Sequence, residues 1–215
     1  MACSDSNSAD EATDAATDAA AEASDDATSN DDDIFAEFNV PDDVELTKPG
    51  TTLKFGEPAV VAVKDHEGIE FYWEITAQEF KRIPQEEFAA QGIDFGDNEP
   101  PKEIVCAIAD VKWAGGDVPD GDESMLMEPP TLTPLGAGDN EANELRAYFG
   151  DICGTDESDV EVRFDEFDPT RTYTADVMSY VDSAGEGIDP TAVAFKYSDA
   201  VLTGGKAGDN AIIWK

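Results

Sequence analysis

Three cysteines are the residues of this sequence whose chemistry their positions constrain most. Cys3 begins a polar, acidic stretch, whereas Cys106 and Cys153 lie in the apolar part of the chain. If the compartment is oxidising, Cys106 and Cys153 form a disulfide that closes a loop of about 47 residues and contributes about 4 kcal/mol through chain entropy. The alternative is that Cys106 is a buried free thiol and Cys153 an incidental surface residue.

Cys3 follows Met1 and Ala2 and is followed at once by Ser, Asp and Ala residues. A lipoprotein has this order after its signal peptide has been cleaved: a small residue, a cysteine, then a polar tether. The order predicts diacylglycerol on Cys3, where each buried methylene adds about 0.8 kcal/mol of membrane affinity. The alternative is that Met1 is a true start and Cys3 a free thiol.

No residue pattern indicates an enzyme. The single histidine, His66, falls in a polar turn, where a solvated imidazole is expected. The sequence lacks a nucleophile elbow, a phosphate-binding glycine loop and a dinucleotide fingerprint. The cysteines and the histidine also lack the paired short spacings of a zinc or iron site. We therefore expect no catalytic residues, no cofactor and no metal.

Two acidic clusters are the candidates for calcium, but neither has the spacing of an EF-hand loop. In a chain with fifty Asp and Glu residues such clusters arise from composition, so solvated charge is the expected role. For the same reason the sequence nominates no pair of glycosidase carboxylates. The clusters are Asp117, Asp120, Asp122 and Glu123, and Asp139, Asn140, Glu141 and Asn143.

The formal net charge of −37 excludes most nucleic-acid partners, because it repels phosphate backbones. It also keeps a protein soluble, and we expect a monomer. Proteins of very salty surroundings have the same acidity, so a halophile origin is the alternative explanation. No apolar run approaches the 18 or more residues of a membrane span.

The composition divides the chain into an acidic linker, residues 1–47, and a folded domain, residues 48–215. Residues 4–33 contain Asp, Ala, Ser, Thr and Glu without aromatic or large aliphatic residues, so they should be disordered. A linker of about 40 residues spans roughly 35 Å, and charge repulsion lengthens it. The apolar group Ile34, Phe35, Phe38 and Val40 either docks on the domain or begins an edge element.

From residue 51 onward, short alternating segments separated by turn residues predict an all-β protein, an antiparallel immunoglobulin-like β-sandwich. Period-two alternation is clearest at 69–77, 160–164 and 172–181. One stretch, 78–91, looks helical, but Pro84 favours a loop with a single helical turn. The predicted strands are 51–55, 59–64, 69–77, 103–113, 160–164, 172–181, 192–198 and 211–214.

One apolar, proline-containing stretch flanked by acidic residues runs from residue 125 to 132. Methionine side chains adapt to varied surfaces, so Met125, Leu126 and Met127 are the candidate contact residues for a protein partner of unknown identity. The alternative is that these side chains cap one open end of the sandwich.

Several segments together resemble the small immunoglobulin-like domains of lipoproteins and secreted antigens from mycobacteria, corynebacteria and related actinobacteria. The resemblance implies that the mid-domain cysteines, Cys106 and Cys153, bridge and that a terminal aromatic residue ends the last strand. The extreme acidity and the insert 94–101 depart from that pattern. The segments are Pro-Gly-Thr-Thr-Leu-Lys-Phe-Gly-Glu-Pro-Ala at 49–59, Ile-Val-Cys-Ala-Ile-Ala-Asp-Val at 104–111, Cys153-Gly154, Tyr-Thr-Ala-Asp-Val at 173–177 and Ala-Ile-Ile-Trp at 211–214.

These observations predict a non-enzymatic lipoprotein at the outer face of the cytoplasmic membrane, in the cell envelope. The membrane would be contacted through the lipid on Cys3, and the sandwich would serve as a binding or accessory module. Two alternatives remain open: an accessory subunit docked on a membrane-protein complex, and a secreted, halophile-type β-sandwich that binds metal or is an enzyme.

Overall fold

The structure is a computed structural model in which β-strands provide nearly all regular structure. Its one α-helix within the described residues is α1 (Gln85–Ala90), which is too short to span a membrane. The described residues are 35–64, 68–93, 95, 99–116, 118, 126–127, 129–145, 152–155, 162–184, 187–197 and 210–215. The strands are β1 (Thr52–Leu53), β2 (Pro58–Lys64), β3 (Glu70–Ala77), β4 (Lys81–Pro84), β5 (Glu103–Trp113), β6 (Leu126–Met127), β7 (Leu132–Leu135), β8 (Val162–Arg163), β9 (Thr172–Val181), β10 (Ala192–Lys196) and β11 (Ala211–Trp214).

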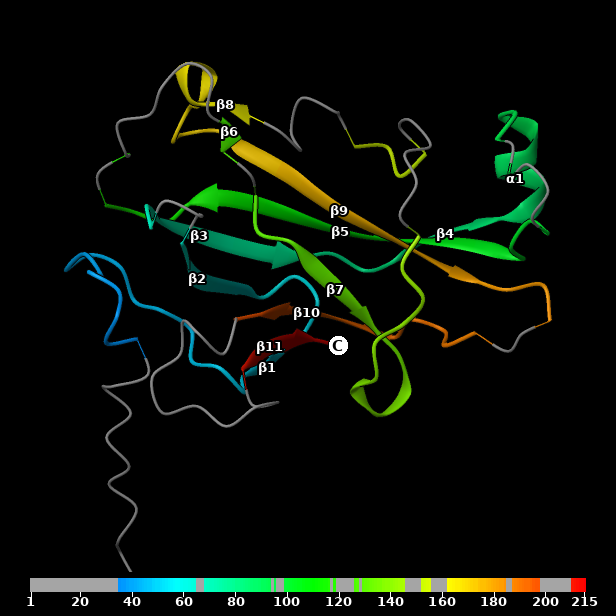
Figure 1. Ribbon diagram of the computed structural model, residues 1–215, viewed down its shortest axis with the longest axis horizontal. Coiled ribbons are helices and arrows are strands. Elements are labelled where there is room, and N and C mark those ends of the chain that lie inside the picture. The colour runs from blue at the N-terminus through cyan, green and yellow to red at the C-terminus, as the bar shows by residue number, and fades with distance from the viewer. Residues whose placement is uncertain are drawn as a thin grey trace, which may run out of the picture. The chain divides into compact units, whose positions relative to one another are not determined.

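Two sheets form the sandwich (Figure 1). The first has the strand order β1-β11-β10-β7, and its β1–β11 pair is parallel. In the second sheet β5 is central, with β9 along one side and both β4 and β3 along the other. Strand β2 then pairs with β3 and forms an edge of this sheet. The all-β antiparallel sandwich predicted from the sequence is confirmed.

The core lies between the sheets and follows from the period of two in each strand. In β3 the side chains of Phe71, Trp73 and Ile75 point inward, and all three are buried. Strand β11 contributes Ile212 and Trp214 from the opposite sheet. The remaining buried members include Val61, Ala107, Ala109, Val111, Tyr173, Val193 and Phe195.

The outer face of the second sheet is covered at both ends, although its middle is polar. At one end Ile104 and Cys106 pack beneath Phe88 of α1. At the other end Ala62 and Tyr72 pack beneath Phe38. Because exposing such apolar patches to water is unfavourable, the segments that cover them belong to the fold.

Residues 35–47, which the predicted boundary places in the linker, belong to this covering. Phe38 is only 7% exposed, and Phe35, Val40, Val44 and Leu46 pack around it. Their apolar surface offsets the chain entropy that the alanine- and aspartate-rich residues before them cannot offset. One of the two units of the chain runs from Asp32 to Lys215, and the segment predicted to be disordered, 4–33, lies outside the described residues.

Three strands were not predicted: β4, β6 and β7. Residues 78–91 were expected to form a loop with one helical turn, but they form β4 followed by α1, with Pro84 as the residue before the helix. Proline suits this place because its fixed φ, here −69°, ends a strand and precedes a helix without losing a hydrogen bond. Strand β7 contains Pro134, which is tolerated because β7 is an edge strand.

Candidate functional site

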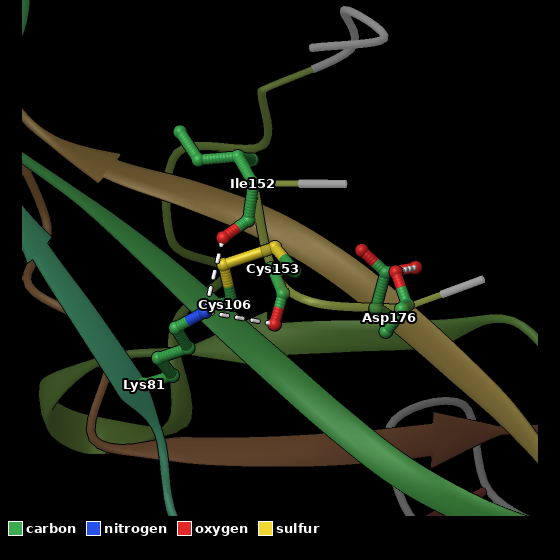
Figure 2. The surroundings of a disulfide bond; sticks show 6 residues. Lys81, Cys106, Ile152, Cys153 and Asp176 are labelled. Atoms are coloured by element: carbon green, nitrogen blue, oxygen red, sulfur yellow. Dashed lines mark hydrogen bonds between the residues drawn. A yellow bond between two sulfur atoms is a disulfide. The ribbon is translucent and has the colours of Figure 1, made fainter. Parts of the chain in front are cut away.

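The predicted disulfide between Cys106 and Cys153 is present, and it pins a turn onto the outer face of the second sheet (Figure 2). Cys106 is the fourth residue of β5, and Cys153 belongs to the turn 152–155. Their Cα atoms are 5.7 Å apart. Cys106 is fully buried and Cys153 is 4% exposed, so thiols in solution do not reach the sulfur atoms without local opening.

Lys81 reinforces the attachment of this turn. It pairs with Cys106 across β4 and β5, which places both side chains on the same face of the sheet. Its Nζ donates hydrogen bonds to the carbonyl oxygens of Ile152 and Cys153, each at 3.1 Å (Figure 2). The ammonium group thus binds carbonyl groups beside the disulfide and holds the turn from the other side.

Asp176 of β9 lies beside the same turn, where it accepts a 3.2 Å hydrogen bond from the Thr155 hydroxyl (Figure 2). Burial raises the pKa of this carboxyl above its ordinary value, and the Thr155 hydrogen bond offsets only part of the rise. The native state therefore binds a proton more tightly than the unfolded chain does. The free energy of unfolding therefore falls as the pH rises from the pKa of Asp176 in the unfolded chain through its higher pKa in the folded protein.

Replacing Asp176 with Asn should raise the melting temperature at neutral pH, because the amide needs no desolvation of a charge and still accepts from Thr155. The gain should shrink as the pH falls and Asp176 becomes protonated. Differential scanning calorimetry at neutral and acid pH measures both effects. Glu79→Gln is the control, because it removes a negative charge at an exposed position. Equal gains from both variants would assign the effect to net charge alone.

The disulfide and the Lys81 hydrogen bonds form a structural cross-link that holds the turn 152–155 on the sheet. Within the described residues no group of three or more His, Cys, Asp or Glu side chains is arranged to hold a metal ion. Nor does that part of the chain contain a buried side-chain nitrogen or oxygen without a hydrogen-bond partner.

The other predicted site residues are only partly described. Several of them lie outside the described residues: Cys3, His66, Met125 and the first acidic cluster, Asp117, Asp120, Asp122 and Glu123. Residues Leu126 and Met127 form β6, which pairs with β8 in a small separate sheet, and the placement of their side chains is not described.

The second acidic cluster does not converge on a common point. Asp139 lies 3.3 Å from the Nζ of Lys215, and Glu141 lies 2.5 Å from the Nζ of Lys196. The amide of Asn140 donates to the carbonyl of Ala137. The cluster is therefore a set of surface ion pairs, each worth little to stability, as the composition suggested.

Sequence reasoning missed Lys81, Asp176 and Glu70, the last of which accepts hydrogen bonds from residue 39. A lone charged residue in a strand of this acidic chain carries no distinguishing pattern. The one available signal was the unbroken apolar run Ile104 to Ile108 in β5, which indicates a strand buried on both faces at that point.

Comparison with known proteins gives no family assignment. The chain matches no known protein family and no curated protein. Among solved structures it resembles MPT63, a secreted protein from Mycobacterium tuberculosis, with a TM-score of 0.43 and 15% sequence identity. The match covers 78% of this chain and 98% of that chain. The assignment of the fold rests on the strands and sheets described above.

Proposed function

We propose that this protein is a non-enzymatic, extracytoplasmic lipoprotein that presents its β-sandwich as a binding or accessory module at the cell envelope. The observation that carries the proposal is the buried disulfide between Cys106 and Cys153. Structural disulfides form and persist in oxidising compartments and are rare in the cytosol. A chain that relies on such a bond for its fold is suited to the outside of the cytoplasmic membrane.

The composition of the N-terminal segment supports an anchored arrangement. The first 47 residues contain fifteen Asp and Glu and no Lys or Arg, with Cys3 near the start. Lipid on Cys3 would bind the bilayer, while the carboxylates would be repelled by anionic headgroups and keep the segment away from them. The domain would then stand off from the membrane surface.

The contact residues of the module remain those of the apolar segment around β6, namely Met125, Leu126 and Met127. Strand β6 belongs to the two-stranded sheet with β8, outside the two main sheets of the sandwich. A partner bound there would not require the core to change. We propose a protein partner, no nucleic acid, and a monomeric chain.

Expression of the full-length gene in its own host tests the anchor directly. We expect the mature protein to partition into the detergent phase, with an intact mass that includes a diacylglycerol group on Cys3. The Cys3→Ser variant should move to the aqueous phase with its melting temperature unchanged, because the sequence places residue 3 in the linker and not in the folded domain. An unmodified wild-type chain in the aqueous phase would refute the anchor.

The same preparation separates the alternatives. A stoichiometric membrane protein that co-purifies from detergent-solubilised membranes would favour a permanently docked accessory subunit. A secreted chain whose melting temperature falls on treatment with a calcium chelator would favour a metal-binding sandwich instead.

A further inference from the structure

Residues 35–47, called the strap below, close the outer edge of β2. The backbone amide of Thr47 donates to the carbonyl of Val60 at 2.8 Å, and the Thr47 hydroxyl accepts from the amide of Val60 at 2.9 Å. Further along the same edge, the amide of Ala62 donates to the Tyr197 hydroxyl at 3.3 Å. The unpaired backbone groups of an edge strand can pair with another strand. Here these contacts pair the backbone groups of Val60 and Ala62 instead.

The rest of the fold is shaped to receive the strap. Phe38 packs against Ala62 and Tyr72, and the ring of Phe35 lies 5.4 Å from that of Tyr197. The turn after β5 contains two glycines with positive φ, Gly115 and Gly116. A Cβ atom on Gly115 would lie 2.8 Å from Val44 and one on Gly116 would lie 2.8 Å from Pro41, closer than real contacts allow. A larger residue at either position would force the side chain of Val44 or Pro41 to shift.

One carboxylate, that of Glu70, provides the polar attachment. It accepts hydrogen bonds from the backbone amide of Asn39 at 2.8 Å and from the Asn39 side chain at 3.2 Å. The Tyr72 hydroxyl donates to it at 2.6 Å, and the Nζ of Lys64 lies 3.3 Å away. Lys64 in turn donates to the carbonyl of Glu37 and lies over the ring of Phe38.

We propose that the strap is a releasable cover, held closed by the Glu70 carboxylate and opened when that carboxylate is protonated or neutralised. Ordering thirteen residues costs conformational entropy of the same order as the free energy gained by burying a handful of apolar side chains. Hydrogen bonds to a charged acceptor are stronger than those to a neutral one, so they decide the balance. A hollow of about 550 Å³ is lined by residues 43–48 together with Thr51, Val60 and Ala114.

The pH dependence follows from the surroundings of Glu70. Burial raises the pKa of this carboxyl, but the hydrogen bonds from Tyr72, Asn39 and Lys64 and the charge of Lys64 outweigh burial and leave the pKa below its ordinary value of 4.5. Docking of the strap is therefore fully favoured above that ordinary value and weakens as the pH falls through the lowered pKa. The titratable groups that face Glu70 are Lys64 on β2 and Tyr72 on β3, and Lys64 also donates to the backbone carbonyl of Glu37 on the strap.

Release would expose the edge of β2 and the Ala62–Tyr72 patch while the sandwich stays folded. Hydrogen–deuterium exchange of the full chain, read by mass spectrometry and divided by the intrinsic rate at each pH, measures this. Four strap amides, those of Phe38, Asn39, Val44 and Thr47, should be protected at about pH 7 and lose protection at about pH 3. Peptides from β5 and β9 should remain protected throughout.

Glu70→Gln should increase exchange of the strap about tenfold at neutral pH, because the charged acceptor is lost, and should abolish most of the acid dependence. The matched control is Glu74→Gln, because Glu74 lies four residues further along β3 and pairs with Lys112 instead. Asn39→Ala, which changes the strap and leaves every strand intact, should reproduce the neutral-pH effect. Unchanged strap protection in both Glu70→Gln and Asn39→Ala would overturn the proposal, as would loss of β5 and β9 protection together with that of the strap.

Discussion

Loss of the disulfide should lower the melting temperature by about 10 °C. The bond closes a loop of 47 residues, for which chain entropy gives a stabilisation of about 4 kcal/mol. In a chain of this size each kcal/mol corresponds to about 2–4 °C. We expect Cys106→Ala and Cys153→Ala to have similar effects, measured by thermal unfolding under non-reducing conditions.

The double variant Cys106→Ala/Cys153→Ala makes this test sharper. If the bond is the main contribution of both residues, the double variant should unfold at about the same temperature as either single variant, because the bond is lost only once. Cys3→Ala serves as the control and should leave the melting temperature unchanged. Additive effects of the two core substitutions would indicate that each cysteine contributes by packing alone.

The bounds and register of a strand could be predicted from the sequence where one of its faces is buried and the other is exposed to solvent. Three strands agree with the predicted ranges at both ends: β5, β9 and β11. In β9 the inward residues Tyr173 and Ala175 alternate with Thr172, Thr174 and Asp176, so the local pattern alone fixes the register.

Two of the missed strands, β4 and β7, are stabilised by residues far away in the sequence. Strand β4 has a single buried side chain, Ile83, and exists because its backbone pairs with β5 about twenty residues later. Strand β7 contains Pro134, a residue that argues against a strand in the sequence. It is tolerated because β7 lies at the edge of its sheet. Neither situation leaves a periodic signal in a short local window.

The site was predictable to the same limited degree. Cys106 and Cys153 were nominated because they are the two cysteines of the domain, and pairing them required no further geometry. Lys81 reaches the carbonyl of Ile152 from a position 71 residues earlier, and Glu70 accepts from Asn39 across 31 residues. Such partners depend on how the sheets are covered, which the local sequence does not encode.

Trp214 should be the side chain whose loss is most damaging to the sandwich. It is fully buried in β11, next to Leu53 of β1 and Val193 of β10. Its indole N–H donates a 2.8 Å hydrogen bond to the carbonyl of Glu57, in the turn that leads into β2 of the opposite sheet. One side chain therefore fills the core and joins the two sheets.

Trp214→Ala should lower the free energy of unfolding by about 3–5 kcal/mol, the range for aromatic residues removed from a core. This is a large part of a typical total of about 5–15 kcal/mol, so Trp214→Phe provides a milder variant that keeps a ring. We expect Trp214→Phe to cost about 1–2 kcal/mol in urea unfolding, since the Glu57 carbonyl loses its donor. Trp113→Phe is the matched control because Trp113 is only partly buried and its bond to Gly116 is longer, at 3.3 Å. If both Phe variants were equally stable, the bond to Glu57 would contribute nothing beyond packing, and the two sheets would be held together by apolar contact alone.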